Sequence, residues 1–494
     1  MMSKSPFIRA WQTLARGFSS MRLQLRSALP LSLALGASAL ALAACSSDDK
    51  STGGNNKNPF ASLPGAALVD VDFVDDKCDI AIEADVYIGG IMPFTGDWPV
   101  GKGFDWGAQL AIREINAHGG INASGDPVGY ISCNTESDQT VGTSLAKELS
   151  KFENLGALIG PGRSVVAVGS GTDSAAAQAA IDAGTLMVSP SATSPRLSTL
   201  DDNGFVFRTT VSDAVQGKVL AKIAEREGFQ RIFVMQTQGD AYAIGLREQF
   251  MSTIAETAGQ EAQFSAFQFS DTDFATGVLD AAKAAWASEG KLPDAILLSM
   301  LSEQAQTILS KAKTYTWGGN APVWMGPDGV KSSEVIDDLA AVQAQSAVFG
   351  TNPGTPSGEA YTKFAAAYKA LWGEDPGQFS SHAYDAAYLI AGAMVLSTDP
   401  SSGTELKTNI WKATGRTDVE GDYGDTFGPD QWAAMKAALV AAGQVNYEGA
   451  SGAVDFDLNG DVLSNIEEWT IATSGSTKNF TTTHCWTADG SSCD

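Results

Sequence analysis

Short apolar runs alternate with amphipathic helical stretches along most of this chain, from Asp85 to Trp469. Runs such as 157–159 and 231–235 have the length of strands, and the stretches after them carry apolar residues at three- and four-residue spacing. Strands that alternate with helices in this way are typical of right-handed β-α-β units and parallel sheets. We therefore expect an α/β fold. No period of 20–50 residues is visible, which excludes solenoids and propellers.

The alternating region is longer than one hydrophobic core usually serves, so we expect two lobes, each a parallel sheet flanked by helices. Residues 205–208 read as a crossing between the lobes, and 349–351 as the return. Residues 453–469 read as an antiparallel pair that turns at Asn459-Gly460. The expected organisation is residues 81–208 plus 350–452 in lobe 1, residues 209–349 plus 453–480 in lobe 2, and a C-terminal tail at 481–494.

The first 44 residues have the features of a secretory signal. They contain five basic residues and no acidic one, and an apolar run over 28–44 ends at Leu42-Ala43-Ala44-Cys45. This ending resembles the bacterial lipobox, in which the cysteine is lipidated; the alternative is an ordinary cleavage site with a chance cysteine. The polar stretch that follows favours lipidation. We expect a signal peptide at 1–44, a lipidated N-terminus and tether at 45–80, and an exported protein held to the membrane by its lipid anchor alone, facing the periplasm or the cell exterior.

The charge balance is strongly acidic. The chain has 32 basic and 57 acidic residues and a net charge of −25, which becomes −30 once the five basic residues of the signal are removed. Such a surface repels nucleic acid and anionic lipid, so neither is expected as a partner. A solubilising surface explains the same charge, which therefore does not identify a ligand.

Four cysteines follow Cys45, and an even number in an exported protein permits two disulfides. Cys485 and Cys493 lie close enough in sequence to close a small loop, which would leave Cys78 and Cys133 as the other pair. Three pairings exist, and the sequence alone does not choose among them. No metal-ligand spacing, nucleophile elbow or phosphate-binding loop is present, so no catalytic residue, metal or cofactor is expected. Residues 455–460 resemble the start of a calcium loop but lack its final glutamate, and are interpreted as a turn.

Two polar loops follow consecutive predicted strands. Gly160-Pro161-Gly162-Arg163-Ser164 comes after Ile159, and the hydroxyl-rich loop 189–195 comes after Val188. Ligands of parallel sheets bind beyond the carboxyl ends of the strands, where hydroxyls, free amides and helix N-termini suit a carboxylate. Each loop taken alone is more often plain turn chemistry. When two such loops follow consecutive strands of one sheet, ligand binding explains them as well as plain turn chemistry does.

A series of motifs along the chain resembles the leucine/isoleucine/valine-binding family of periplasmic solute receptors that serve ABC transporters. The resemblance covers nearly all of 85–470, and implies a two-lobed periplasmic-binding-protein-like type I fold with three inter-lobe crossings. The motifs that carry it are, in order, Pro93-Phe94-Thr95-Gly96, residues 114–122, Ile159-Gly160-Pro161, residues 189–195, Met325-Gly326-Pro327-Asp328-Gly329, Ala383-Tyr384-Asp385-Ala386 and residues 452–457.

The resemblance also implies positions for a ligand. Ser164 and Thr193 align with residues that hold the ligand's carboxylate, and Ser191 and Ala192 complete that cradle. Tyr242 packs over the ligand, and Asp328 pairs with its ammonium group, although Pro-Asp-Gly is a strong turn sequence by itself. The chain departs from the family at Arg163, where small polar residues are usual. It also departs at the expected lining of the ligand's side-chain pocket, which here includes Trp98 and Leu301.

The resemblance therefore implies a non-enzymatic solute-binding lipoprotein that captures a small amino acid or amino-acid-like ligand by lobe closure. Its partner would be an inner-membrane ABC permease. One alternative is a ligand-sensing receptor of the same fold coupled to signalling. Others are the binding of an amide, urea-like or aromatic-acid ligand, and a hydrolase on the same fold, which no motif supports.

Overall fold

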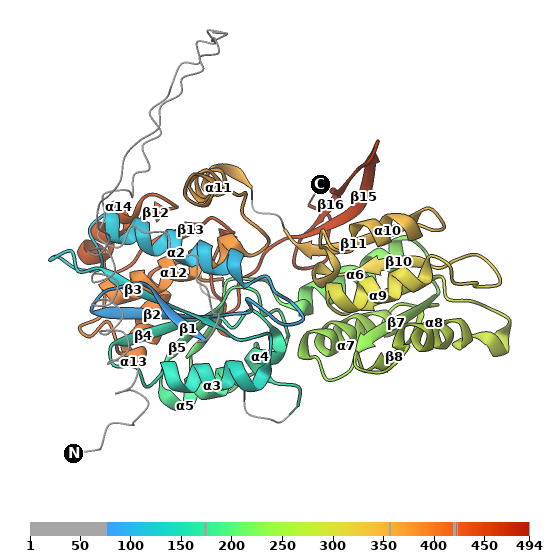
Figure 1. Cartoon of the computed structure of the whole chain (residues 1–494). Helices are drawn as coiled ribbons and strands as arrows, with labels where there is room; N and C mark the ends of the chain where they lie inside the picture. The colour runs from blue at the N-terminus through green and yellow to red at the C-terminus, as the bar shows by residue number, and fades with distance from the viewer. Residues whose placement is uncertain (1–76, 172–174, 355–356, 418–420, 422, 494) are drawn as a thin grey trace, which may run out of the picture. The chain divides into compact units, whose positions relative to one another are not determined.

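The computed structural model describes residues 77–171, 175–354, 357–417, 421 and 423–493 (Figure 1). The predicted signal peptide at 1–44, the lipidation site Cys45 and most of the tether at 45–80 lie outside these residues. Within the described ranges, no helix combines the length and the apolar character that a membrane span requires.

Lobe 1 is built on a six-stranded sheet with the order β1-β3-β2-β4-β5-β6. All neighbouring strands are parallel except β1, which runs antiparallel to β3 at the edge. The central strands are buried on both faces, which explains their continuous apolar sequences, such as Leu-Gly-Ala-Leu-Ile in β4. The strands are β1 (Cys78–Ile82), β2 (Val86–Met92), β3 (Val128–Asn134), β4 (Leu155–Ile159), β5 (Leu186–Ser189) and β6 (Val206–Arg208).

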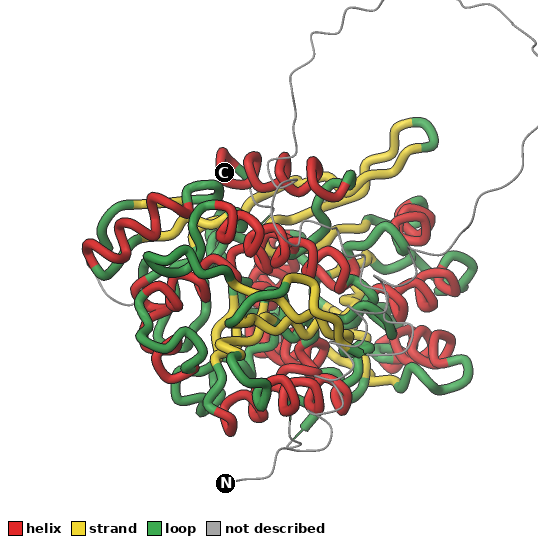
Figure 2. Tube along the Cα trace, turned by 60° about the vertical axis from the view of Figure 1, so that its left-hand side comes forward, coloured by secondary structure: helices red, strands yellow, loops and turns green. Residues whose placement is uncertain are grey.

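Helices cover both faces of this sheet (Figure 2). One face carries four helices that pack into a single core: α2 (Gly101–Ala117), α11 (Gly358–Trp372), α12 (Ser380–Val395) and α14 (Trp432–Ala442). The opposite face carries α3 (Gln139–Leu149), α4 (Ser164–Val168) and α5 (Ala176–Ala183). Lobe 1 also contains α13 (Gly403–Asn409) and a small sheet of β12 (Thr426–Phe427), β13 (Asn446–Gly449) and β14 (Gly452–Ala453).

Lobe 2 is built on a seven-stranded sheet with the order β16-β15-β11-β10-β9-β7-β8. Strand β15 runs antiparallel to both of its neighbours, β11 and β16. The strands are β7 (Arg231–Thr237), β8 (Glu261–Phe267), β9 (Ala295–Ser299), β10 (Val323–Gly326), β11 (Val348–Pro353), β15 (Ile466–Ser474) and β16 (Thr477–Trp486). On one face lie α6 (Asp213–Arg226) and α7 (Ala241–Ala255), and on the other α8 (Phe274–Ala284), α9 (Ser302–Ala312) and α10 (Ile336–Gln343). These two sheets confirm the predicted two-lobed α/β fold.

The chain crosses between the sheets three times: after β6, after β11 and before β15. The return follows Pro353, because residues 350–353 still pair with β15, so the predicted boundary at 350 lies a few residues too early. The third crossing also comes later than the predicted boundary at 453. Ala453 pairs with β13, and Phe456 is buried in the core of lobe 1.

The antiparallel hairpin near the C-terminus was predicted at the wrong turn. At Asn459-Gly460 the two arms share only the single bridge between Phe456 and Val462, and the Asp457 carboxylate caps the turn instead. The extended hairpin is β15–β16, which turns at Gly475 and includes the first part of the predicted 481–494 tail. The sequence pattern missed it because the outer ends of both strands are exposed and lack an apolar face.

Both disulfides join neighbouring segments. Cys78 in β1 is bonded to Cys133 in β3, and Cys485 at the end of β16 is bonded to Cys493. Among the three pairings that the sequence allowed, the structure therefore contains the one in which the two C-terminal cysteines close a small loop.

Candidate functional site

The two polar loops of lobe 1 lie side by side, because they follow the adjacent parallel strands β4 and β5. Ser164 is the first residue of α4, and its Oγ accepts a hydrogen bond from Ser194 N at 3.1 Å. Ser191 Oγ donates to Gly162 O at 2.9 Å, which ties the second loop to the first. The two loops thus form one continuous wall on which hydroxyls and amides are concentrated.

The facing wall belongs to lobe 2. Tyr242 lies in the first turn of α7, where the N-cap Asp240 accepts hydrogen bonds from Tyr242 N and Ala243 N. The Tyr242 hydroxyl donates to Asp328 Oδ1 at 2.7 Å and accepts from Gly329 N at 3.0 Å. A side chain at Gly329 would meet the Tyr242 hydroxyl at 2.9 Å, so only glycine allows this close approach.

These two walls enclose a cavity. It is lined by Trp98, Gly162, Arg163, Ser164, Ser191, Thr193, Tyr242, Leu301, Asp328 and Gly329. Seven of the eight residues predicted to bind ligand are therefore together; the eighth, Ala192, is buried and does not line the cavity. The volume open to the centres of water molecules is only about 20 Å³, which is room for one or two waters. A larger ligand does not fit in the cavity at this separation of the lobes.

Sequence reasoning missed one residue of this region, Asp213. It is the first residue of α6, it is fully buried, and its backbone N donates to Thr193 O at 2.8 Å. Within the described residues, neither of its carboxylate oxygens has a hydrogen-bond partner. The sequence held no signal for it, because an aspartate in the first turn of a helix is common in any protein.

Asp213 and Asp328 form a buried acidic pair. Burial raises the pKa of Asp213 well above its usual range, and the charge of Asp328 raises it further; the nearby Thr193 hydroxyl and Arg208 lower it by less. Burial also raises the pKa of Asp328, whereas the hydrogen bond from Tyr242 lowers it by less. A cation beside Asp328 would favour the ionised forms of both carboxyls. The lobe 2 side of the cavity is therefore suited to a positively charged group.

The remaining lining residues come from both lobes. Trp98, in the loop after β2, packs against the hydrophobic clusters of lobe 1 and lobe 2 and stacks edge-on against Phe104. Leu301 is the N-cap residue of α9. Arg163 is bonded to Asp97 of lobe 1 and to Asp240 of lobe 2, and so bridges the two lobes directly.

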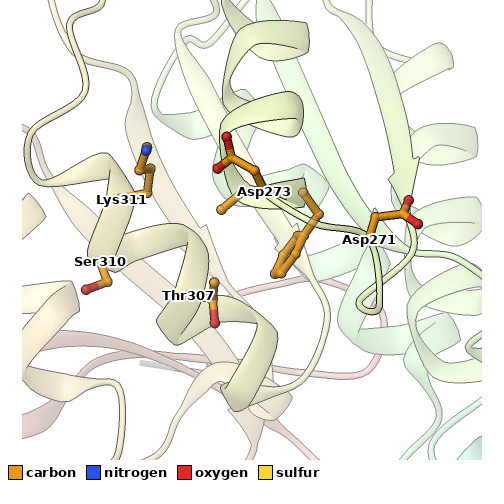
Figure 3. A pocket seen from close by; sticks show the side chains of 7 residues that line it. Asp271, Asp273, Thr307, Ser310 and Lys311 are labelled. Atoms are coloured by element: carbon orange, nitrogen blue, oxygen red, sulfur yellow. The ribbon is translucent and has the colours of Figure 1, made fainter.

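A second, wider hollow of about 390 Å³ lies on the surface of lobe 2, between α8 and α9 (Figure 3). It shares no lining residue with the inter-lobe cavity, and the side chains labelled in Figure 3, Asp271, Asp273, Thr307, Ser310 and Lys311, are all exposed. Size alone does not make it the ligand site, because it lacks the enclosure and converging buried polar groups that mark such sites. Within the described ranges, no group of three His, Cys, Asp or Glu side chains is placed to hold a metal ion.

The fold and the inter-lobe cavity define a two-lobed ligand-binding protein of the periplasmic binding protein type I class. Residues 107–472 match the model of the family described as receptor family ligand binding region, and the chain belongs to that family. It is a binding-protein family rather than an enzyme family.

The alignments with similar proteins cover most of the length of those proteins. The chemotactic signal transduction system substrate-binding protein BasB of Halobacterium salinarum is 26% identical over 386 residues, which are 75% of this chain and 83% of that protein. A leucine-, isoleucine-, valine-, threonine-, and alanine-binding protein of Pseudomonas aeruginosa is 28% identical over 344 residues, 67% of this chain and 82% of that protein.

Solved structures show the same fold. The leucine-binding protein LivK of Thermotoga maritima superposes with a TM-score of 0.61 at 23% identity, covering 80% of this chain and 97% of its own. A solute-binding protein of an ABC transporter from R. palustris, solved with benzoate, gives a TM-score of 0.60 at 16% identity, covering 80% and 95%.

Proposed function

We propose that this protein captures a small amino acid between its lobes for import through an ABC permease. The observation that carries the proposal is the opposed chemistry of the two cavity walls. Lobe 1 presents the hydroxyls of Ser164 and Thr193, and lobe 2 presents the buried acid Asp328 with Tyr242. A carboxylate needs donors and an ammonium group needs acceptors, so a zwitterion matches both walls when its two ends face opposite lobes.

Capture would proceed by closure. The cavity is too small to admit an amino acid with the lobes in contact, so the ligand enters an open form and is enclosed afterwards. A zwitterion that touches both walls binds the closed form more tightly than the open one, and this difference in affinity shifts the population towards closure. The closed form is then the species that a partner recognises.

The names of the relatives agree with an amino acid as ligand, since the Pseudomonas aeruginosa protein is named for five of them. An aromatic acid, such as the benzoate held by the R. palustris protein, would use the hydroxyl wall alone. It would leave the buried acid Asp328 without a cation in the cavity, which makes an aromatic acid the weaker candidate here. Chemotactic sensing is the second candidate for the readout, because BasB belongs to a chemotactic system.

A thermal-shift and calorimetric screen of the purified protein against amino acids, amides and aromatic acids tests the ligand class. A ligand at a hundred times its Kd should stabilise the protein by about 2.7 kcal/mol. Thr193→Val should abolish this shift while the unliganded melting temperature stays nearly unchanged. Thr143→Val, at another buried threonine of lobe 1 outside the cavity, is the matched control. Stabilisation by aromatic acids alone would refute the amino-acid assignment.

We further propose that the signal at 1–44 is removed and that Cys45 carries the lipid anchor. The support is the sequence of the segment alone. Metabolic labelling with a fatty-acid analogue should mark the wild type, and Cys45→Ser should lose both the label and the association with membranes. Retention of the label by that variant would contradict the proposal.

A further inference from the structure

Three lining residues of the cavity, Trp98, Arg163 and Leu301, have no part in the proposed site for the ligand's head group. If the carboxylate lies at Ser164 and Thr193 and the ammonium group at Asp328, the ligand's side chain faces the rest of the lining. The side chains there that the head group does not use are those of Trp98, Arg163 and Leu301. Arg163 is the one cation in the lining, and nothing in the proposed head-group site makes use of it.

The guanidinium of Arg163 is held from both lobes. Nη1 donates to Asp97 and to Ser137 O, at 3.1 Å for the latter, and Nη2 donates to Asp240 Oδ2 at 2.5 Å. Asp97 and Ser137 belong to lobe 1, whereas Asp240 is the N-cap of α7 in lobe 2. The Arg163 side chain is only 10% exposed. The bond between Arg163 and Asp240 exists only while the lobes are in contact. In the closed form the guanidinium is therefore held in place and closes one end of the cavity.

A long side chain could enter this end only by pushing Arg163 away from one of its partners. Separation from Asp240, whose side chain is 7% exposed, would leave a buried carboxylate without its counter-charge, which is strongly unfavourable. An acidic side chain finds no relief there, because two carboxylates already neutralise the guanidinium and Glu303 lies near Asp97. Any amino acid needs more room than the cavity offers with the lobes in contact, and a short, uncharged side chain gains it with the least displacement of Arg163.

We infer that Arg163, held by Asp97 and Asp240, is a specificity-determining residue that restricts the ligand to amino acids with short, uncharged side chains. The inference rests on the proposed function and narrows it.

Calorimetric titration of the wild-type protein with alanine, serine, leucine, phenylalanine and glutamate is the first test. We expect alanine or serine to bind at least tenfold more tightly than leucine, phenylalanine or glutamate. Tighter binding of leucine or phenylalanine would overturn the inference while leaving the proposed function intact. Tighter binding of glutamate would also overturn it, since Arg163 would then be a ligand for an acidic side chain. Binding of no amino acid at all would overturn both.

Arg163→Ser and Arg163→Gln provide the second test. The ratio of the leucine Kd to the alanine Kd should fall at least tenfold in Arg163→Ser, because the end of the cavity is opened. Arg231→Ser is the matched control. Arg231 is 15% exposed and bonds Asp294 and Leu292 O, but at the start of β7, away from the cavity. An unchanged ratio in both Arg163 variants, each with a folded circular dichroism spectrum, would overturn the inference.

Discussion

Arg208 and Asp461 form a bidentate ion pair, with Arg208 Nε at 2.7 Å from Asp461 Oδ1 and Nη2 at 2.7 Å from Oδ2. Arg208 ends β6 just before the first inter-lobe crossing, and Asp461 lies in the third crossing. The Arg208 side chain is 1% exposed, and its Nη1 also donates to Ser194 O at 3.0 Å. One guanidinium therefore links two of the three crossings to the hydroxyl-rich loop of the cavity.

Breaking this pair should destabilise the protein strongly. Asp461→Asn should lower the free energy of unfolding by about 3–5 kcal/mol, because it leaves the buried charge of Arg208 without a counter-charge. Urea denaturation measures the change. Asp337→Asn, which removes the exposed ion pair with Lys478, is the control and should cost at most about 1 kcal/mol. Equal decreases in the free energy of unfolding of the two variants would show that the Arg208–Asp461 pair stabilises the protein no more than an exposed ion pair does.

Ligand binding should release protons. Burial raises the pKa of both Asp213 and Asp328, and a bound ammonium group would lower them again, so affinity should increase as pH rises and the free acids lose their protons. Calorimetry in two buffers of different ionisation enthalpy counts the protons released.

Asp213→Asn should weaken amino-acid binding at least tenfold, about 1.4 kcal/mol, and reduce that proton release. Asp105→Asn is the control, since Asp105 is an equally buried acid of α2 outside the cavity. Binding that is independent of pH in the wild type would contradict a cationic group at the acidic pair.

Glu114 should make the unliganded protein less stable as pH rises. Burial raises the pKa of Glu114 from 4.5 to about 7, against the hydrogen bonds from Tyr384 and Tyr388. The folded state therefore favours the protonated form, and the resulting stability, up to about 3 kcal/mol, is complete below pH 4.5 and lost as pH rises through 7. Glu114→Gln should flatten this part of the stability profile, whereas the exposed Glu148→Gln should keep the wild-type slope. Identical slopes in both variants would refute the assignment.

The two disulfides should differ in their contribution to stability. Cys78–Cys133 closes a separation of 55 residues and Cys485–Cys493 one of 8. A cross-link that closes a longer loop restricts the unfolded chain more, so replacing the first pair by serine should cost about 2–4 kcal/mol, and replacing the second pair less. Chemical denaturation of the two double variants compares them. The reverse order would show that strain or local contacts outweigh chain entropy.

Much of the fold was predictable because the sequence patterns that indicate its strands and helices are local. Continuous apolar runs such as β4 identify buried parallel strands, and the polar loops after β4 and β5 could be placed together because adjacent parallel strands end at the same edge. The β15–β16 hairpin was not predictable in the same way, since exposed strand ends have no apolar period. Local patterns therefore describe cores better than edges.

The site was only partly predictable for a related reason. The resemblance to a family placed Ser164, Thr193, Tyr242 and Asp328 in one site, and the structure brings them together. Asp213 and the partners of Arg163 depend on contacts between segments far apart in sequence, which no local pattern encodes. Arg163 stood out in the sequence as a departure, but its role depends on Asp240, which lies in the other lobe.

The bond between Cys78 and Cys133 also determines where the protein can bear a mechanical load. Any pull on the polypeptide that precedes Lys77 reaches lobe 1 at β1, an edge strand held to β3 by hydrogen bonds that could be unzipped one after another. Cys78 is the first residue of that strand, so the disulfide passes the force covalently to β3 before β1 can peel away. A pulling force applied at this end therefore does not open the sheet of lobe 1 from its edge.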